Sequence, residues 1–174
     1  MGKCGVGKNS LICRLCNTVP PPKNEVTLKG NDKSLLNIEG QEYEVEIQDT
    51  SGEEDYPNMI DMCINCGEGF LLVFAINDAE SFEFLKGIHD KVLKGKHGVE
   101  CPFLLVGSKQ DLEDERQVTH AEAKQLADSW GIEYIETSAK KNFNCKEAFT
   151  KLTQKIVSTR KPSNTKNGCP CNIM

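Results

Sequence analysis

Residues 2–9 of this chain read Gly2-Lys3-Cys4-Gly5-Val6-Gly7-Lys8-Asn9. The stretch fits the pattern G-x-x-x-x-G-K-[ST] except at its last position, where asparagine replaces serine or threonine. In such a loop, backbone N–H groups and the N-terminus of the following helix face phosphate oxygens, while the lysine supplies a positive charge. The stretch therefore predicts a phosphate-binding loop that opens a helix.

Length, charge and cysteine content limit what the chain can be. With 174 residues it is long enough for one domain with a substantial core. Its net charge of -5 gives no electrostatic reason to expect a nucleic-acid partner. The nine cysteines are interpreted as reduced thiols, because the count is odd and no apolar signal segment precedes the loop. No run of about 18 apolar residues is present, so no membrane-spanning helix is expected.

Apolar patterns along the rest of the chain alternate between strands and helices. Residues 35–38 and 43–47 flank Glu39-Gly40 and predict a β-hairpin, because the second run alternates apolar with acidic side chains. Residues 70–76 and 102–106 are continuously apolar, as is typical of strands covered on both faces. Helical patterns fall at about 9–17, 79–95, 119–130 and 144–159. This order predicts an α/β fold, with an open, mostly parallel sheet, helices on both faces and one antiparallel hairpin strand.

Three further polar segments follow predicted strands. Residues 49–52 (Asp-Thr-Ser-Gly) come after the hairpin, residues 108–111 (Ser-Lys-Gln-Asp) after the run at 102–106, and residues 137–140 (Thr-Ser-Ala-Lys) after a short apolar run. The carboxyl ends of parallel strands form the edge where open α/β sheets bind their ligands. Each segment is weak evidence alone, but their order behind a phosphate-binding loop makes coincidence improbable.

With these segments in this order, essentially the whole chain resembles the Ras-like small GTPases. The number of residues between Lys8 and Asp49 is similar to that in the Ras branch. Residues 67–77 and 134–140 are also similar in sequence to the corresponding stretches of that branch. The resemblance implies a P-loop NTPase fold that lacks the family's first strand, because only Met1 precedes the loop.

The resemblance also implies a domain organisation and a function. A GTP-binding domain would cover residues 1–159, and residues 160–174 would form a flexible tail. The chain would be a monomeric molecular switch that binds GTP and GDP with Mg²⁺ and hydrolyses GTP slowly. Its protein partners would be an exchange factor, an activator and effectors, and γ phosphate with Mg²⁺ would hold two loops that relax after hydrolysis.

For the guanine base, the resemblance assigns Asp111 to accept the hydrogens at N1 and N2, which adenine lacks. Lys109 would lie along the base and ribose, and the backbone N–H of Ala139 would bind the guanine oxygen. The complete set of predicted nucleotide-binding residues is Gly2, Lys3, Cys4, Gly5, Val6, Gly7, Lys8, Asn9, Ser10, Asp49, Gly52, Ser108, Lys109, Asp111, Leu112, Ser138, Ala139 and Lys140.

For the metal and the reaction, the resemblance assigns a second group of residues. Asp49 would hold a water on Mg²⁺, Thr27 would bind both Mg²⁺ and the γ phosphate, and the Gly52 N–H would bind the γ phosphate. Glu53 stands where the family has the glutamine that orients the attacking water. The predicted metal ligands are Asn9, Thr27 and, through water, Asp49, and the predicted catalytic residues are Glu53, Thr27, Lys8 and Gly52.

Departures from the family pattern bear on the phosphate and metal site. The amide of Asn9 sits on a longer arm than a serine and fits poorly in an octahedron with oxygens at about 2.0–2.1 Å. Ser10 is no substitute, because one residue along a helix points about 100° away. Cys4 adds bulk where an activator's arginine would approach. Glu53 can hold a water but adds negative charge near the phosphates, which leaves the sign of its effect open.

Further departures bear on the base and on partners. Ser108 replaces the asparagine of N-K-x-D and shortens an arm that ties the base site to the phosphate loop. Pro20 occupies the position of an aromatic residue that covers the guanine face in the family. Residues 28–32 (Leu-Lys-Gly-Asn-Asp) lack the acidic effector stretch of Ras, so the effector partners are expected to differ.

The chain ends on Cys171-Asn172-Ile173-Met174, a C-a-a-X motif that predicts farnesylation of Cys171. One lipid gives marginal anchoring, so Cys169 is a candidate for palmitoylation as the second signal. The competing interpretation is an accidental four-residue match. We expect attachment through the farnesyl lipid to the cytoplasmic face of a membrane, the plasma membrane first.

Cysteines and histidines elsewhere in the chain could be metal ligands or ordinary core and surface residues. The pairs Cys13-x-x-Cys16 and Cys63-x-x-Cys66 have zinc-ligand spacing, but both fall on predicted helical segments, where thiols usually pack as small hydrophobes. The histidines share no such spacing, and we expect them at the solvated surface: His89, His97 and His120.

Two classes of function stay open on the sequence alone. The retained motif segments favour a membrane-anchored GTP/GDP switch. Asn9, Ser108 and Pro20 together favour a nucleotide-impaired relative that acts as a non-enzymatic interaction module. The missing strand would lie between those ending near Asp49 and starting near Phe70, and its absence would leave costly unpaired backbone groups. We therefore expect either a shortened form of a longer protein or a poorly stable relative.

Overall fold

The computed structural model describes residues 1–18, 31–50, 57–160 and 171–174. Its first two strands, β1 (Asn31–Ile38) and β2 (Gln41–Gln48), pair antiparallel over their whole length. Glu39 and Gly40 connect them with φ angles of +52° and +87°. Two successive positive φ angles are what a two-residue hairpin turn requires. The predicted hairpin is therefore confirmed.

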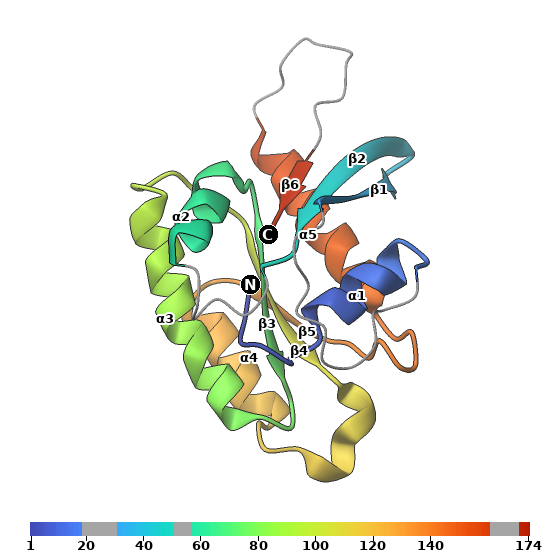
Figure 1. Ribbon diagram of the computed structural model, residues 1–174, viewed down its shortest axis with the longest axis vertical. Coiled ribbons are helices and arrows are strands. Elements are labelled where there is room, and N and C mark those ends of the chain that lie inside the picture. The colour runs from blue at the N-terminus through green and yellow to red at the C-terminus, as the bar shows by residue number, and fades with distance from the viewer. Residues whose placement is uncertain (19–30, 51–56, 161–170) are drawn as a thin grey trace.

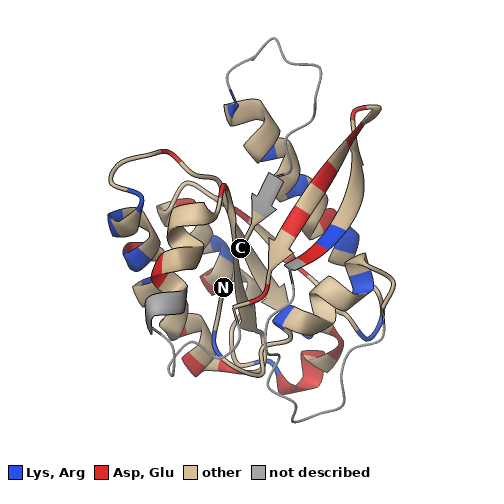
Figure 2. Ribbon diagram, turned by 45° about the horizontal axis from the view of Figure 1, so that its top comes forward, with Lys and Arg blue, Asp and Glu red and all other residues tan. Residues whose placement is uncertain are grey.

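Strand β2 has one buried and one solvated face. Val45 and Ile47 are at most 2% exposed and belong to the core, whereas Glu42 and Glu44 on the other face are exposed. Figure 2 shows acidic residues in red along the hairpin. The alternation seen in the sequence thus corresponds to a half-buried strand.

The parallel part of the sheet consists of β3 (Phe70–Ala75), β4 (Phe103–Ser108) and β5 (Glu133–Glu136), in that order. Every residue of β3 and β4 is buried. Helices cover these strands on both sides, as Figure 1 shows. The predicted α/β class and the two continuously apolar strands are confirmed.

Helices on the two faces of the sheet enclose two separate hydrophobic clusters. Those packed with the first cluster are α1 (Lys8–Leu15) and α5 (Cys145–Thr159). Those packed with the second cluster are α2 (Pro57–Cys66), α3 (Ala79–Gly95) and α4 (His120–Ser129). Helix α4 begins at a capping box, in which Thr119 and Glu122 exchange hydrogen bonds.

The sheet position between β2 and β3 is filled by the last residues of the chain. Strand β6 (Cys171–Ile173) pairs parallel with β2, and Ile173 forms a parallel bridge with Gly69. The Leu71 N–H donates to the carbonyl of Met174 at 2.7 Å. The expectation of unpaired backbone groups at this position is therefore wrong for Gly69 and Leu71. The expected flexible tail likewise does not extend to the last four residues, because their backbone is held by both neighbouring strands.

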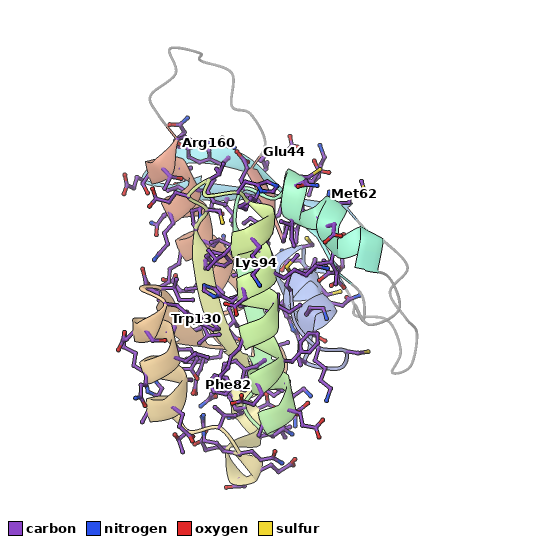
Figure 3. All side chains as sticks on the ribbon, turned by 90° about the vertical axis from the view of Figure 1, so that its left-hand side faces the viewer. Glu44, Met62, Phe82, Lys94, Trp130 and Arg160 are labelled. Carbon is purple, nitrogen blue, oxygen red and sulfur yellow. The ribbon has the colours of Figure 1, made fainter. Side chains whose placement is uncertain are left out.

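His89 lies in the core and not at the surface, which corrects the sequence interpretation. It is 6% exposed, and its ring stacks on Trp130 with centroids 4.0 Å apart. Figure 3 shows Trp130 beside α3, the helix that carries His89. A neutral imidazole stacks on aromatic rings as a largely apolar group, so a histidine on the inner face of an amphipathic helix can belong to the core. His97 and His120 are exposed, as expected.

Candidate functional site

The phosphate-binding loop has the backbone shape that its glycines predict. Gly5 and Gly7 have φ angles of +79° and +95°, and Gly7 is the N-cap of α1. A Cβ on Gly2 would lie 2.0 Å from the carbonyl oxygen of Val73 in β3, so the loop packs too closely on the sheet for any side chain there. The glycines thus place successive backbone groups in front of a helix N-terminus, the arrangement that binds phosphates.

Lys8 folds back across this loop. Its ammonium group donates to the carbonyls of Gly2 and Lys3, the latter at 3.1 Å. Lys3 itself extends outward and forms an ion pair with Glu80 at 2.6 Å, and Cys4 is exposed. A phosphate seated on the loop would therefore meet the charge of Lys8, which the loop's own carbonyls already hold in position.

Asn9 turns its side chain along the helix. Its Oδ1 accepts a hydrogen bond from the Cys13 thiol, one turn later on α1, with sulfur and oxygen 2.9 Å apart. Ser10, the next residue, is partly buried. The Asn9 oxygen is thus engaged within the helix, in addition to being a poor geometric match for a Mg²⁺ octahedron.

Asp49 and Thr50 lie where β2 ends, and both are buried, at 8% and 2% exposure. They line a small cavity together with Lys8 of the loop helix. The Oγ1 of Thr50 is buried and has no hydrogen-bond partner within the described residues, so this position offers an unused polar group. The structure therefore brings Asp49 and Lys8 together, as the site assignment requires.

Among the described residues assigned to the metal, Asp49 has the carboxylate that could hold Mg²⁺. Mg²⁺ commonly takes one or two protein carboxylates and fills the remaining positions with water and substrate phosphates. When bound, the ion would neutralise charge on the β and γ phosphates. The other residues assigned to the metal and the reaction lie outside the described residues, as does the residue expected beside the base: Thr27, Gly52, Glu53 and Pro20.

The base-binding segments meet at the carboxyl ends of β4 and β5. The Ser138 hydroxyl donates to Oδ1 of Asp111 at 2.5 Å, and the Nζ of Lys140 lies 4.0 Å from its Oδ2. The Gln110 N–H donates to the carbonyl of Thr137, which joins the two segments through the backbone. Because the Asp111 side chain is only 9% exposed, its carboxylate is held in one orientation, as bidentate recognition of guanine requires.

The remaining assigned residues surround this carboxylate. Lys109 adopts a left-handed conformation with φ of +61° and is the N-cap of the short 3-10 helix η2 (Gln110–Glu115), which includes Leu112. The Leu112 N–H donates to the Lys109 carbonyl at 2.8 Å. On the opposite segment, the carbonyl of Ala139 accepts from Nε of Arg14 in α1 at 2.6 Å. The helix that follows the phosphate loop thus also contacts the base-binding segment.

Ser108 connects the base site directly to the phosphate loop. Its hydroxyl donates to the carbonyl of Val6 at 2.5 Å, and the contact is buried. The side chain is shorter than the family's asparagine, yet it reaches the loop. The expected weakening of this tie through a shorter arm is therefore not what the structure shows.

A charged cluster that the sequence analysis did not identify supports the segment at 137–140. Arg116 donates through both terminal nitrogens to Glu136, the last residue of β5, and through Nε and one terminal nitrogen to Glu113. The Tyr134 hydroxyl donates to Glu136 at 2.7 Å. Burial and this hydrogen bond raise the pKa of the Tyr134 phenol, which therefore remains a donor at neutral pH. The sequence signal that could have found the cluster was the pair of acidic residues, Glu133 and Glu136, at the two ends of the short run that contains Tyr134.

Of the two cysteine pairs considered for zinc, one lies on α1 and its C-cap and the other on α2. Among the described residues, no group of three potential metal ligands comes together. Cys13 and Cys63 are buried, and each belongs to a helix packed on a different face of the sheet. Both act as core residues in this fold.

Comparison with known proteins places this geometry in context. A family model described as "Ras family" matches residues 1–158. The chain is 36% identical over 170 residues to "Ras-related protein O-RAL" of Diplobatis ommata, which covers 97% of this chain and 82% of the relative. It is 38% identical over 168 residues to "Ras-related protein ralB-A" of Xenopus laevis, with 96% and 81% covered, and 37% identical over 160 residues to "Ras-related protein Ral-a" of Drosophila melanogaster, with 92% and 80% covered.

Proposed function

Since the chain belongs to the Ras family of small GTPases, which bind GDP and GTP with Mg²⁺ and hydrolyse GTP, we propose that it is a membrane-anchored switch that hydrolyses GTP slowly. The observation that carries the proposal is the buried hydrogen bond between Ser108 and Val6. It fixes the phosphate loop against the strand end that leads to Asp111, so that one ligand can reach both.

Guanine selectivity is assigned to Asp111. Ser138 occupies one of its carboxylate oxygens at 2.5 Å and fixes the plane of the group. A carboxylate so oriented accepts the N1 and N2 hydrogens of guanine but meets no such pair on adenine. The expected ligands are GTP and GDP, with ATP bound much more weakly.

Slow turnover is proposed from the metal side of the site. Asn9 replaces a hydroxyl ligand and gives its oxygen to Cys13, so Mg²⁺ has fewer protein ligands in the described region than the family pattern supplies. When bound, Mg²⁺ would stabilise the negative charge of the β and γ phosphates, so a weaker Mg²⁺ site would slow hydrolysis and would lower the affinity for GTP more than that for GDP. The proposed protein therefore favours GDP at rest.

Membrane attachment is proposed through the terminal Cys171-Asn172-Ile173-Met174 motif, with farnesyl on Cys171 and palmitoyl on Cys169 as the second signal. Within the described residues, no helix has the length and apolar character needed to cross a bilayer. Lipid would then be the means of attachment, and the cytoplasmic face of the plasma membrane is the proposed location.

The test of nucleotide recognition compares GTP, GDP and ATP binding, each with and without Mg²⁺, in the wild-type protein and in Asp111→Asn. We expect the substitution to lower guanine-nucleotide affinity at least about 100-fold, because a buried acceptor pair is lost. Asp114→Asn on the same η2 helix is the matched control, since this residue is exposed. Equal binding of ATP and GTP by the wild type would refute guanine recognition.

Single-turnover hydrolysis of bound GTP separates the switch from a non-enzymatic interaction module. Conversion to GDP within hours, abolished by Lys8→Ala, is the expected result. Binding of GTP with no conversion beyond the protein-free rate would refute slow hydrolysis and favour the interaction module instead.

A further inference from the structure

The last four residues lie in the central sheet, between two segments that are far from them in the sequence. Cys171, Asn172 and Ile173 lie opposite Val45, Glu46 and Ile47 of β2, in parallel. On the other side, the Met174 N–H donates to the Gly69 carbonyl at 3.0 Å and the Met174 carbonyl accepts from Leu71. Both edges of this strand are therefore hydrogen-bonded.

Met1 continues the same strand position from the opposite end of the chain. Its ammonium group donates to the Leu71 carbonyl at 2.5 Å, and its carbonyl accepts from the Val73 N–H at 2.8 Å. Leu71 of β3 thus contacts both chain ends: its N–H binds Met174 and its carbonyl binds Met1. Figure 1 shows the two chain ends close together beside β3. Two separate segments together form one interrupted central strand that leads into the phosphate loop.

The last two side chains, Ile173 and Met174, are buried on opposite faces of the sheet. Ile173 is fully buried among residues of α1, α5 and the hairpin, and Met174 is 3% exposed among residues of α2 and α3. Gly67 leaves room for Met174: a Cβ there would lie 2.6 Å from its Cγ. The slot between β2 and β3 is thus shaped for an extended, parallel peptide with two apolar side chains.

We propose that this slot is a binding site for the chain's own C-terminal tetrapeptide, and that docking there and farnesylation of Cys171 exclude each other. An enzyme that lipidates the motif has to reach Cys171 and read the residues behind it. In the docked state Ile173 and Met174 are inside the core, and the Cys171 backbone is paired with β2. The docked chain completes the sheet, whereas the released chain presents its lipidation motif. The exclusion of farnesylation rests on the proposed lipidation of Cys171, whereas docking of the tetrapeptide does not.

The first test measures farnesylation by a purified farnesyltransferase with farnesyl diphosphate, on the full chain and on a synthetic peptide of residues 161–174. We expect kcat/KM for the full chain to be at least about tenfold lower, because the motif is accessible only in the minor, released state. Equal rates on both substrates would overturn the exclusion alone. A peptide that is not modified at all would overturn the proposed lipidation together with the exclusion.

The second test changes the slot and leaves the motif intact. Gly67→Ala places a methyl group 2.6 Å from Cγ of Met174 and 2.9 Å from the Phe70 ring, whereas a Cβ on Gly87 in α3 meets nothing within 4 Å, so Gly87→Ala is the control. We expect Gly67→Ala to raise the farnesylation rate of the full chain several-fold toward that of the peptide, and Gly87→Ala to leave it unchanged. Equal rates in both variants would contradict docking at Gly67.

Hydrogen exchange provides a readout that does not depend on a variant folding. In the unmodified full chain the Leu71 amide is held by Met174, so we expect it to be protected. In the farnesylated full chain we expect it to exchange at least about tenfold faster, while the Leu105 amide in the parallel core of β4 keeps its protection. Equal protection of Leu71 before and after farnesylation would refute the exclusion.

Discussion

The Ser108 hydroxyl and the Val6 carbonyl are joined by a buried hydrogen bond of 2.5 Å, which connects the carboxyl end of β4 with the phosphate loop. The two residues lie 102 positions apart in the chain. Through this one contact, a change at the base-binding end of the site can alter the loop that holds the phosphates.

Ser108→Ala should lower both stability and nucleotide affinity. Removing the hydroxyl leaves the buried Val6 carbonyl without its donor, at a cost of about 1–3 kcal/mol. Urea denaturation without nucleotide and GDP affinity by fluorescence would measure the two effects. Ser129→Ala is the control, because its hydroxyl donates to a carbonyl at the exposed end of α4. A Ser108 variant as stable as the Ser129 variant would show that the contact contributes nothing.

Asn9→Ser should strengthen the Mg²⁺ dependence of GTP binding. The substitution removes the Cys13 contact and places a hydroxyl where the family pattern has a metal ligand. We expect the Mg²⁺ concentration that half-saturates GTP binding to fall about tenfold, equivalent to about 1.4 kcal/mol. Asn65→Ser, an exposed change on α2, should leave it unchanged. If both variants titrate alike, Asn9 does not limit the metal site.

His89 should make stability depend on pH in the acidic range. Burial lowers the pKa of its imidazole, although the neighbouring Asp90 partly opposes this. Unfolding exposes a histidine with a pKa of about 6.5, so the unfolded state binds more protons below that value. The free energy of unfolding is therefore expected to be at its full value above pH ~6.5 and to decrease as the pH falls below it.

The measurement for His89 is the free energy of unfolding across that pH range, compared with His89→Phe. The variant keeps an aromatic ring against Trp130 and cannot titrate, so we expect a flatter profile. His97→Gln, at an exposed position, should retain the wild-type profile. A wild-type slope in His89→Phe would assign the acid sensitivity to other groups.

Arg116→Ala should destabilise the segment that leads to the guanine site. The Glu136 side chain, 13% exposed, would lose its bidentate partner and keep only the Tyr134 hydroxyl. We expect a loss of about 2 kcal/mol in the free energy of unfolding, between the values for exposed and fully buried pairs. Lys124→Ala, which breaks an exposed pair with Asp128, should cost no more than about 0.5 kcal/mol. Similar costs in the two variants would refute a special role for Arg116.

The phosphate loop, the hairpin, the buried parallel strands and the helix positions could be predicted because each depends on neighbouring residues. Glycine at Gly5 and Gly7 sets a local backbone conformation, and alternation along β2 records which side faces the core. The order of the segments then brought Asp49 and Asp111 to the same sheet edge. Contacts within the site, such as Ser138 with Asp111, depend on rotamers that no local pattern specifies.

Local patterns along the chain were enough to predict the fold class, the family and the order of the site segments around the nucleotide. Three features depend on long-range contacts and became visible only in the folded chain: the segment that fills the central strand position, the contact of Ser108 with the loop and the burial of His89. The physical reason is that a strand of three residues has too few side chains to show a period. Its stability comes from partners on β2 and β3 that lie more than 90 residues away. Local patterns therefore predicted a missing strand at this position, which long-range backbone pairing of residues 171–174 fills.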